Sequence, residues 1–181
     1  MRAVRIGSVL SFLLCASPIP AQSTPIEDPE RAAVLSVTQR LFDAMRAKDT
    51  SAMRSVFHAS AKLVGMRPAA GGGTRVQVLT ADEFIAFVGR DARSDWNERV
   101  WAPEVRIEGT LASVWAPYDF HFGSTFSHCG TDAVHLLKTP DGWRITALAD
   151  TYQTSGCPQR PSPSMAGLRT ERLADSVYAI V

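Results

Sequence analysis

The sequence predicts an α+β fold in which a strongly curved, mostly antiparallel sheet forms a cone and three helices from the N-terminal half pack on its concave side. Two observations lead to this expectation. Within residues 28–157 helical apolar spacing occurs before residue 90, and strand patterns separated by turns run from residue 96 to residue 152. A bent sheet crossed by a long helix encloses a cavity of the kind that binds small molecules.

The first predicted helix starts at Asp28, because its carboxylate can cap the helix and Pro29 suits the first helical position. Apolar residues then recur on one side of it: Val34, Val37, Leu41, Phe42 and Met45. Asp49 or Thr50 caps a second, short helix that continues the buried face. Both helices therefore need an apolar surface to cover.

Two strands are expected next, over residues 61–66 and 75–79, with the Pro and Gly-rich stretch 68–73 between them. Thr80 and Glu83 have the spacing of a capping box, which opens the third helix. We expect four of its side chains to point inward: Phe84, Ile85, Phe87 and Val88.

The rest of the domain is predicted to be a meander of antiparallel strands. We expect strands over 98–108 and 110–122, then a long hairpin over 126–152. Thr139-Pro140-Asp141-Gly142 supplies its turn, since Pro presets φ and Gly accepts a positive φ.

The turn places Leu136 beside Ile145, and this register decides which hairpin side chains share a face. His128 and Asp132 then fall at the far end of the inner, apolar face. The other titratable hairpin residues are expected on the outer face: His135, Arg144, Asp150 and Tyr152. A partly apolar, partly charged outer face favours contact with a second copy, so we expect a homodimer through it.

Four segments carry a family resemblance: LFDAMRAKDTSAMRSVFHASAKLV, ASVWAPYDFHF, FSHCGTDAVHLL and DGWRITALADTYQTSGC. They resemble the nuclear transport factor 2-like superfamily, in particular its SnoaL-like and lumazine-binding-like bacterial branch. The resemblance covers about residues 28–157 and implies a cone-shaped α+β domain and frequent dimers. Its members range from isomerases, dehydratases and cyclases to non-catalytic binding or assembly domains, so the fold does not decide the function.

Three residues are candidates for catalysis. His128 has a side chain that moves protons near neutral pH, or it is a buried histidine bonded to a neighbour. Asp132 could act with it through a bridging substrate, or be a buried acid satisfied by the Trp115 indole or by backbone groups. Tyr118 could polarise a carbonyl group, as in ketosteroid isomerase, or be an ordinary core aromatic.

Aromatic residues of the helix stripe and the inner sheet face are expected to bind the ligand: Phe42, Trp115, Tyr118 and Trp143. Pro117 can bulge its strand, so alternation leaves open which of Trp115, Tyr118 and Asp119 faces the cavity. Such a lining suits a small apolar or aromatic ligand.

The N-terminal residues 1–21 are predicted to be a signal peptide, because Arg2 and Arg5 precede a short apolar run that ends in small residues. We therefore expect a periplasmic or secreted protein, the alternative being an uncleaved N-terminal anchor. Residues 158–181 are predicted to be a Pro and Ser-rich linker with a loosely attached tail, in which residues 165–178 could form one helix.

Cys129 and Cys157 remain once the signal is removed, and such a pair in an exported protein favours a disulfide. The alternative is one buried strand thiol and one unpaired loop thiol. No cofactor is expected, and the histidine spacing offers no metal motif. Without residues 1–21 the formal charge is 17 basic minus 18 acidic residues, or −1, which argues against nucleic acid and membrane partners.

These observations favour an exported small-molecule-binding protein of unresolved activity. One alternative is a SnoaL-like or ketosteroid-isomerase-like enzyme that acts by proton transfer as an isomerase, dehydratase or hydrolase, with His128 or Asp132 as base and Tyr118 as polariser. Another is a non-catalytic dimeric accessory domain. A cavity of about 300 Å³ or more would separate the first two from the third.

Overall fold

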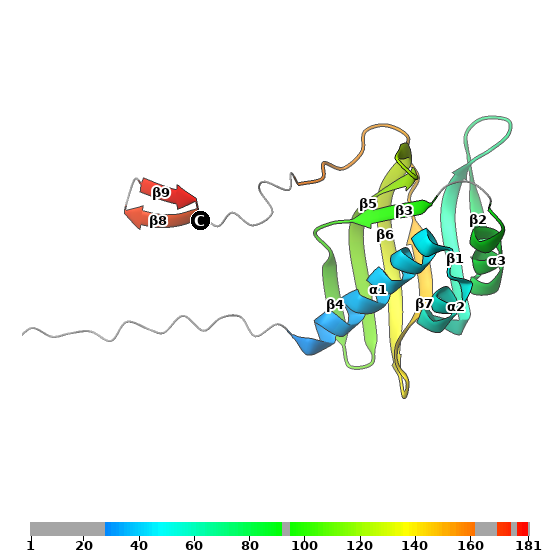
Figure 1. The fold of residues 1–181 in the computed structure, drawn as a ribbon, viewed down its shortest axis with the longest axis horizontal. Coiled ribbons are helices and arrows are strands. Elements are labelled where there is room, and N and C mark those ends of the chain that lie inside the picture. The colour runs from blue at the N-terminus through cyan, green and yellow to red at the C-terminus, as the bar shows by residue number, and fades with distance from the viewer. Residues whose placement is uncertain (1–27, 92–94, 162–169, 175–176, 181) are drawn as a thin grey trace, which may run out of the picture.

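The computed structural model describes residues 28–91, 95–161, 170–174 and 177–180. The predicted signal peptide lies outside them. A seven-stranded curved sheet carries three helices on one side, with α1 lying across the sheet (Figure 1). None of the described helices has the length and apolar character needed to cross a membrane.

The helices begin where the capping residues predict. Helix α1 (Pro29–Ala47) follows Asp28, whose carboxylate accepts a hydrogen bond from a first-turn backbone N–H. Helix α2 (Thr50–Val56) is capped by Asp49, and α3 (Ala81–Arg90) opens with the expected capping box. All five residues of the predicted α1 stripe are buried.

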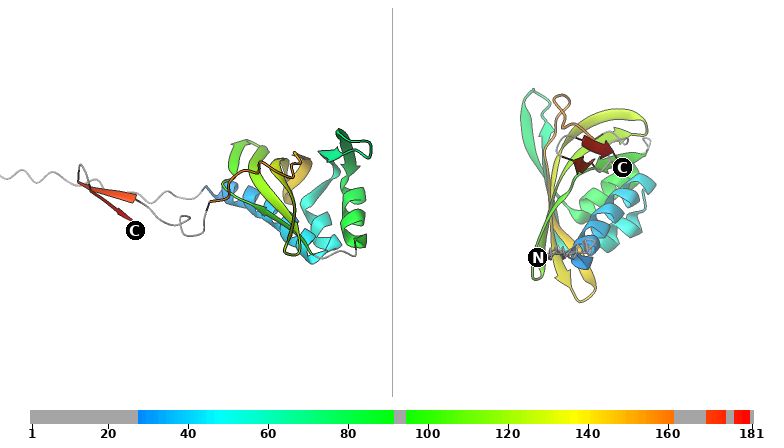
Figure 2. Two further views of the ribbon diagram at one scale, coloured as in Figure 1. Left: turned by 90° about the horizontal axis from the view of Figure 1, so that it is seen from above. Right: turned by 90° about the vertical axis from the view of Figure 1, so that its left-hand side faces the viewer.

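The main sheet has the strand order β2-β1-β7-β6-β5-β3, with β4 also pairing with β5. Its strands are β1 (Phe57–Pro68), β2 (Thr74–Thr80), β3 (Trp96–Val100), β4 (Glu104–Glu108), β5 (Leu111–Phe122), β6 (Thr125–Thr139) and β7 (Gly142–Asp150). Every neighbouring pair is antiparallel except β1 and β7. The two further views in Figure 2 show the helices on the same side of the curved sheet. The predicted α+β cone is therefore confirmed.

The strand expected over 98–108 is in fact two strands, β3 and β4. Ala102 between them has a φ of 44°, and Pro103 has no backbone N–H to donate. Both strands still pair with β5. Because of the break, β5 pairs with two short strands instead of one long strand: β3 along its second half and β4 along its first half.

A bulge in β7 corrects the predicted faces of the hairpin. Leu136 lies opposite Ile145 as expected, but His135 lies opposite Ala147, so Thr146 is an extra residue. An extra residue inverts the alternation beyond it. Asp150 and Tyr152, which alternation alone places outside, therefore lie on the inner face, where both line the cavity described below.

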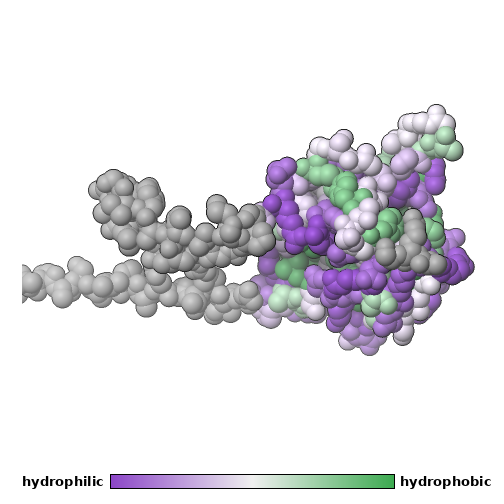
Figure 3. Space-filling model, turned by 45° about the horizontal axis from the view of Figure 1, so that its top comes forward, coloured by the Kyte–Doolittle hydropathy of each residue, from purple (hydrophilic) through white to green (hydrophobic). Residues whose placement is uncertain are grey.

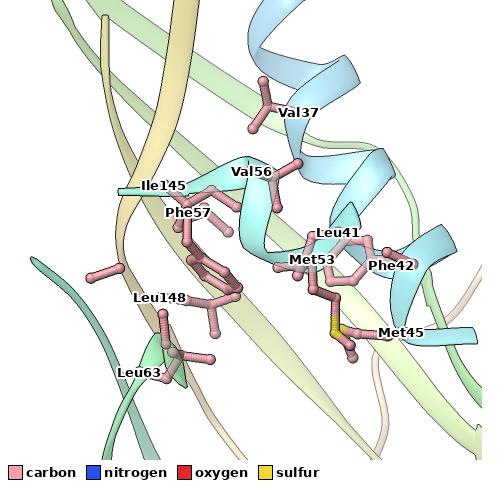
Figure 4. Packing of buried hydrophobic residues seen from close by; sticks show 14 of the residues in the cluster. Val37, Leu41, Phe42, Met45, Met53, Val56, Phe57, Leu63, Ile145 and Leu148 are labelled. Atoms are coloured by element: carbon pink, nitrogen blue, oxygen red, sulfur yellow. The ribbon is translucent and has the colours of Figure 1, made fainter. Parts of the chain in front are cut away.

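The core lies between the helices and the concave face of the sheet. Figure 4 shows side chains of α1 and α2 meeting those of β1 and β7, among them Leu41, Met45, Met53, Val56, Phe57, Leu63, Ile145 and Leu148. All of these are at least nine-tenths buried. The described outer surface in Figure 3 is mixed, with small hydrophobic patches between hydrophilic ones.

After β7 the chain stays attached to β6. Gln153 and Cys129 form an antiparallel backbone bridge, and a disulfide joins Cys129 to Cys157. Further on, β8 (Thr170–Ala174) and β9 (Val177–Ile180) pair with each other in a separate two-stranded sheet. The helix expected over 165–178 is therefore wrong in its described part, where strand-forming residues such as Val177 and Tyr178 pair locally.

Replacing Cys157 with Ser tests the mechanical role of the disulfide. The bond closes a loop of 28 residues, so its loss should cost about 2–4 kcal/mol of unfolding free energy. Urea unfolding of the Cys157→Ser variant measures this, and added reductant should lower the midpoint of the wild type to that of the variant. Equal midpoints for oxidised wild type and variant would contradict the prediction.

Candidate functional site

A cavity of about 580 Å³ lies inside the cone, within the size range of small-molecule sites. Helix α1 contributes Leu41, Phe42 and Met45 to its lining, and α3 contributes Phe84 and Phe87. The sheet supplies both apolar and titratable side chains. The cone is therefore hollow, and its wall is chemically divided.

An aromatic cluster forms the apolar part of the wall, with Trp96 at its centre. Its indole meets four rings edge to face at centroid distances of 5.4–6.5 Å: Phe84, Phe87, Phe120 and Phe122. Such edge-to-face contacts are the preferred geometry of aromatic pairs. Rings from α3, β3 and β5 thus form a preorganised apolar surface.

Two carboxyl groups meet at the polar part of the cavity. Glu98 lies on β3, two residues after Trp96 and so on the same face, and Asp132 comes from β6. The two carboxyl groups lie within hydrogen-bonding reach of each other. Asp132 is only 2% exposed, and its Oδ2 atom has no hydrogen-bond partner among the described residues. A buried polar atom without a partner costs about 1–3 kcal/mol.

Burial favours the protonated form of both acids. It raises the pKa of Glu98 to about 7, against which the hydrogen bond from Asp132 acts in the lowering direction. Burial, together with the adjacent Glu98, raises the pKa of Asp132 well above its ordinary value. A hydrogen bond between two carboxyl groups needs one proton, and Asp132 is the acid that keeps it. Asp132 is therefore suited to donate a proton, and not to act as the base that the sequence suggested.

A third carboxyl group, that of Asp150, is held by Arg67. The guanidinium donates to both carboxylate oxygens at 2.7 and 3.1 Å, in the bidentate geometry that suits this pair. Burial raises the pKa of Asp150, and the Arg67 hydrogen bonds oppose that effect. Gly65 makes room for the pair, since a Cβ there would lie 2.1 Å from Asp150 Oδ1 and 2.4 Å from Arg67 Nη1.

Tyr118 faces the cavity from β5 and is 1% exposed. Its hydroxyl donates to the Thr151 carbonyl oxygen at 2.7 Å and lies 3.4 Å from Asp150 Oδ2. Burial and the nearby carboxylates raise its pKa, so the phenol keeps its proton. Because that proton is engaged by Thr151, the hydroxyl oxygen can accept a hydrogen bond from a ligand more readily than it can donate one.

The His128 ring is sandwiched between two other rings. It stacks on Tyr152 at 4.2 Å and on Phe120 at 4.9 Å between centroids. Burial, with a smaller effect of Arg67, lowers the pKa of His128 to about 4. Its imidazole is therefore neutral at pH 7, and both of its ring faces are covered by protein.

Two of the four predicted ligand-binding aromatics lie elsewhere. Phe42 and Tyr118 line the cavity, but Trp115 is 57% exposed on the outer face, because the apolar set that includes Ala116 and Tyr118 takes the inner one. Trp143 is buried in the core, and its indole N–H donates to Glu30 of α1 at 2.9 Å.

Sequence reasoning missed Glu98, Arg67 and Asp150. Glu98 was within reach, because alternation from the large apolar Trp96 places it on the same inward face. Arg67 lies just beyond the strand end expected at residue 66. Asp150 was placed on the wrong face because no local signal marks the bulge.

The described residues contain no group of three or more His, Cys, Asp or Glu side chains arranged to hold a metal ion. What the site offers is a proton held between two carboxyl groups, a third carboxylate paired with arginine, and an aromatic wall beside them. This arrangement can receive a polar group from a ligand at one side and its apolar body at the other.

Replacing Glu98 with Gln tests the raised pKa. Between its ordinary value of 4.5 and about 7, the folded protein holds a proton that the unfolded chain gives up. This stabilisation is present at low pH and is lost as the pH rises through 7, by at most about 1.4 kcal/mol per pH unit. The Glu98→Gln variant lacks it, so its stability relative to the wild type should improve from about pH 5 to about pH 8.

Urea unfolding of both proteins across this range measures the difference. The lowered pKa of His128 acts in the opposite direction, but it is common to both proteins and cancels in the comparison. Glu108→Gln, the same change at an exposed position of β4, is the matched control and should follow the wild type. A stability difference that does not vary with pH would contradict the prediction.

Comparisons with known proteins agree with this architecture. A search of curated proteins finds no match. Among solved structures, an NTF-2 like protein of unknown function from Silicibacter pomeroyi is 20% identical with a TM-score of 0.53, and the match covers 69% of this chain and 97% of that one. A "putative dehydratase" of the NTF2-like family from Streptomyces avermitilis is 14% identical with a TM-score of 0.55, covering 70% and 98%.

A third solved structure, a protein of unknown function from Mycobacterium tuberculosis, is 12% identical with a TM-score of 0.58, covering 71% of this chain and 79% of that one. At these identities the likeness shows the fold alone. The family model described as "Putative lumazine-binding" matches residues 29–152, which is more than half of the chain. The chain therefore belongs to this lumazine-binding-like family, and its fold is that of the NTF2-like structures.

Proposed function

We propose that this protein is exported and binds a small molecule inside the cone. The observation that carries the proposal is the cavity of about 580 Å³ in which the buried Asp132 Oδ2 has no hydrogen-bond partner among the described residues. A chain keeps such an atom at a cost, and a ligand that bonds to it removes the cost.

The division of the wall suggests how the ligand lies. The ring cluster around Trp96 accepts an apolar or aromatic body, and the Glu98 and Asp132 pair accepts a polar group. Apolar pockets with a few convergent polar groups are typical of small-molecule sites. The rings are already packed against one another, so binding requires little reordering of the wall.

Proton-transfer catalysis is the second candidate, and the same carboxyl pair favours it. The raised pKa of Glu98, about 7, is suited to a general base, and Asp132 beside it holds a proton to donate. The Streptomyces avermitilis structure named above is a "putative dehydratase" of the same fold. This candidate requires that Glu98→Gln abolish turnover of the ligand while leaving its binding intact; turnover by that variant would exclude it.

Export is supported by two features at opposite ends of the chain. Residues 1–21 have the charge and apolar pattern of a signal peptide, and the domain carries the Cys129 to Cys157 disulfide. Disulfides persist in oxidising compartments and are rare in the cytosol. A periplasmic or secreted location follows, and a protein found only in the cytosolic fraction of its host would contradict it.

The predicted homodimer is part of the proposal. Leu111 and Leu137 are register partners on the outer face, both about half exposed, and the 57% exposed Trp115 lies on the same two-stranded region. A shallow groove beside Trp115 includes His135 and Arg106. Exposed apolar side chains on a sheet face, rimmed by polar ones, are typical of subunit contacts.

Replacing Trp115 with Glu tests this contact. Buried charge at an apolar interface is strongly unfavourable, so the variant should sediment as a monomer where the wild type sediments as a dimer. Ser51→Glu, on the exposed side of α2, is the control for added charge and should remain dimeric. A monomeric wild type, or a dimeric Trp115→Glu variant, would count against the outer face as the interface.

Replacing Phe87 with Ala tests the cavity itself. Phe87 is half exposed, so its truncation should disturb folding little, yet it lines the cavity. We expect the neutral fluorescent probe N-phenyl-1-naphthylamine to bind the wild type, and Phe87→Ala to weaken binding by about 1 kcal/mol, or roughly fivefold. Fluorescence titration measures both.

Leu111→Ala is the matched control, because Leu111 is equally exposed but lies on the outer face. It should bind the probe as the wild type does. Native mass spectrometry of protein purified from its own host should in addition show a retained small molecule that the probe displaces. Absence of probe binding by the wild type would refute the proposed function.

A further inference from the structure

The balance of charge in the cavity points to the class of ligand. Three carboxyl groups line it, from Glu98, Asp132 and Asp150, but Arg67 is already engaged by both oxygens of Asp150. No ion pair within the described residues reaches Glu98 or Asp132, although both lie in the same cavity. Arg67 and Arg75 line the same cavity, but among the described residues neither forms an ion pair with Glu98 or Asp132.

We infer that the ligand carries a positively charged nitrogen, as an organic ammonium group, which lies against the Glu98 and Asp132 carboxyl pair. This inference rests on the proposed function and deepens it by naming the ligand class. The second observation behind it is the Asp132 Oδ2 atom, buried and without a hydrogen-bond partner among the described residues. An ammonium N–H can donate to that oxygen, which a carboxylate ligand cannot do.

The aromatic wall suits the same ligand. Phe120 and Trp96 are neighbours of the acidic pair on the inner face of the sheet. Glu98 lies directly opposite Phe120 in the register of β3 and β5, and Trp96 packs on Phe120. Tyr152 already has the Arg67 guanidinium 5.8 Å from its ring centroid. Ring faces attract cations, and a set of rings beside carboxylates is how proteins recognise organic ammonium groups.

Other ligand charges fit less well. A carboxylate ligand would face two acids and would have to compete with Asp150 for the Arg67 guanidinium. A neutral carbonyl could accept the proton of Asp132, but it would leave any charge on Glu98 buried and unpaired. An ammonium group both donates to Asp132 Oδ2 and balances the charge that Glu98 carries when it is ionised.

The inference includes a proton balance. Without ligand the pair holds the proton of its own hydrogen bond; when an ammonium binds, that proton leaves to water and both carboxylates face the cation. Affinity for the ammonium should therefore rise with pH, because a free proton is a product of binding. An alkylammonium stays charged throughout the neutral range.

Other charged and titratable groups line the same cavity: Arg67 from β1, Arg75 from β2, Tyr118 from β5, His128 from β6 and Asp150 from β7. Burial raises the pKa of Tyr118 and lowers the pKa of His128 to about 4, so neither titrates near pH 7. Arginine stays charged. Asp150 remains bound to Arg67, so the Glu98 and Asp132 pair is the group that exchanges the proton.

Three probes of one shape and different charge test the inference: phenylbutylamine, phenylbutanol and phenylbutyrate. Isothermal titration of the full mature chain should show the amine binding about tenfold or more tightly than the alcohol, with the carboxylate weakest. The affinity of the amine should fall about tenfold per pH unit, or about a hundredfold from about pH 8 to about pH 6, while that of the alcohol does not fall. Titration in buffers of different ionisation enthalpy should show release of one proton per amine.

The double variant Glu98→Gln with Asp132→Asn removes the charge and keeps the shape. It should lose about tenfold in affinity for the amine and none for the alcohol. Glu108→Gln, on exposed β4, should match the wild type for all three probes. Binding of the neutral probe N-phenyl-1-naphthylamine shows that each variant retains a folded cavity.

The outcomes separate this inference from the function on which it rests. If the alcohol or the carboxylate binds as tightly as the amine, or if the double variant keeps its affinity for the amine, the ammonium inference is overturned while small-molecule binding stands. An amine that fails to bind a protein that takes up the neutral probe overturns it as well. If neither the neutral probe nor any of the three binds the wild type, the proposed function itself fails.

Discussion

The extra residue in β7, Thr146, is the constraint on which the site depends. By inverting the alternation of side chains beyond it, the bulge turns Leu148 and Asp150 from the outer face to the cavity. Asp150 then meets Arg67 across the parallel β1 and β7 pair, and Gly65, its register partner, leaves the space that the ion pair needs. Without the bulge the cavity would lack its third acid, and Arg67 would lose its carboxylate partner.

The buried acids inside the cone cost stability but give the cavity its chemistry. An apolar residue at position 132 would stabilise the fold by removing a buried oxygen that has no hydrogen-bond partner among the described residues. An apolar residue at position 98 would do so by removing an acid whose pKa burial raises to about 7. These costs are local, because α1 and α2 form a continuous apolar core with β1 and β7 next to the cavity. A well-packed core can offset the cost of buried acids at a functional site.

Sequence reasoning succeeded where the signal was local. The caps at Asp28 and Thr80 and the turn at residues 139–142 placed the helices and the hairpin register, because each involves residues only a few positions apart. It placed His128 and Asp132 on the inner face for the same reason, and it left open whether Tyr118 faces the cavity. It failed for Trp115 and Trp143, since choosing among several apolar residues requires knowing which face and which layer each strand segment occupies.

The amino-acid sequence alone was enough to predict the fold class and the starts of the helices, and it favoured the disulfide between the two cysteines. Helix caps, turns and the spacing of apolar residues all act over short stretches of chain. Only the folded arrangement brought Glu98 on β3 against Asp132 on β6, and Arg67 on β1 against Asp150 on β7. These contacts join residues 34 and 83 positions apart, and bulges set their register. A bulge is decided by the total packing of the sheet, so no local pattern could reveal the contact of Asp150 with Arg67 that the β7 bulge creates.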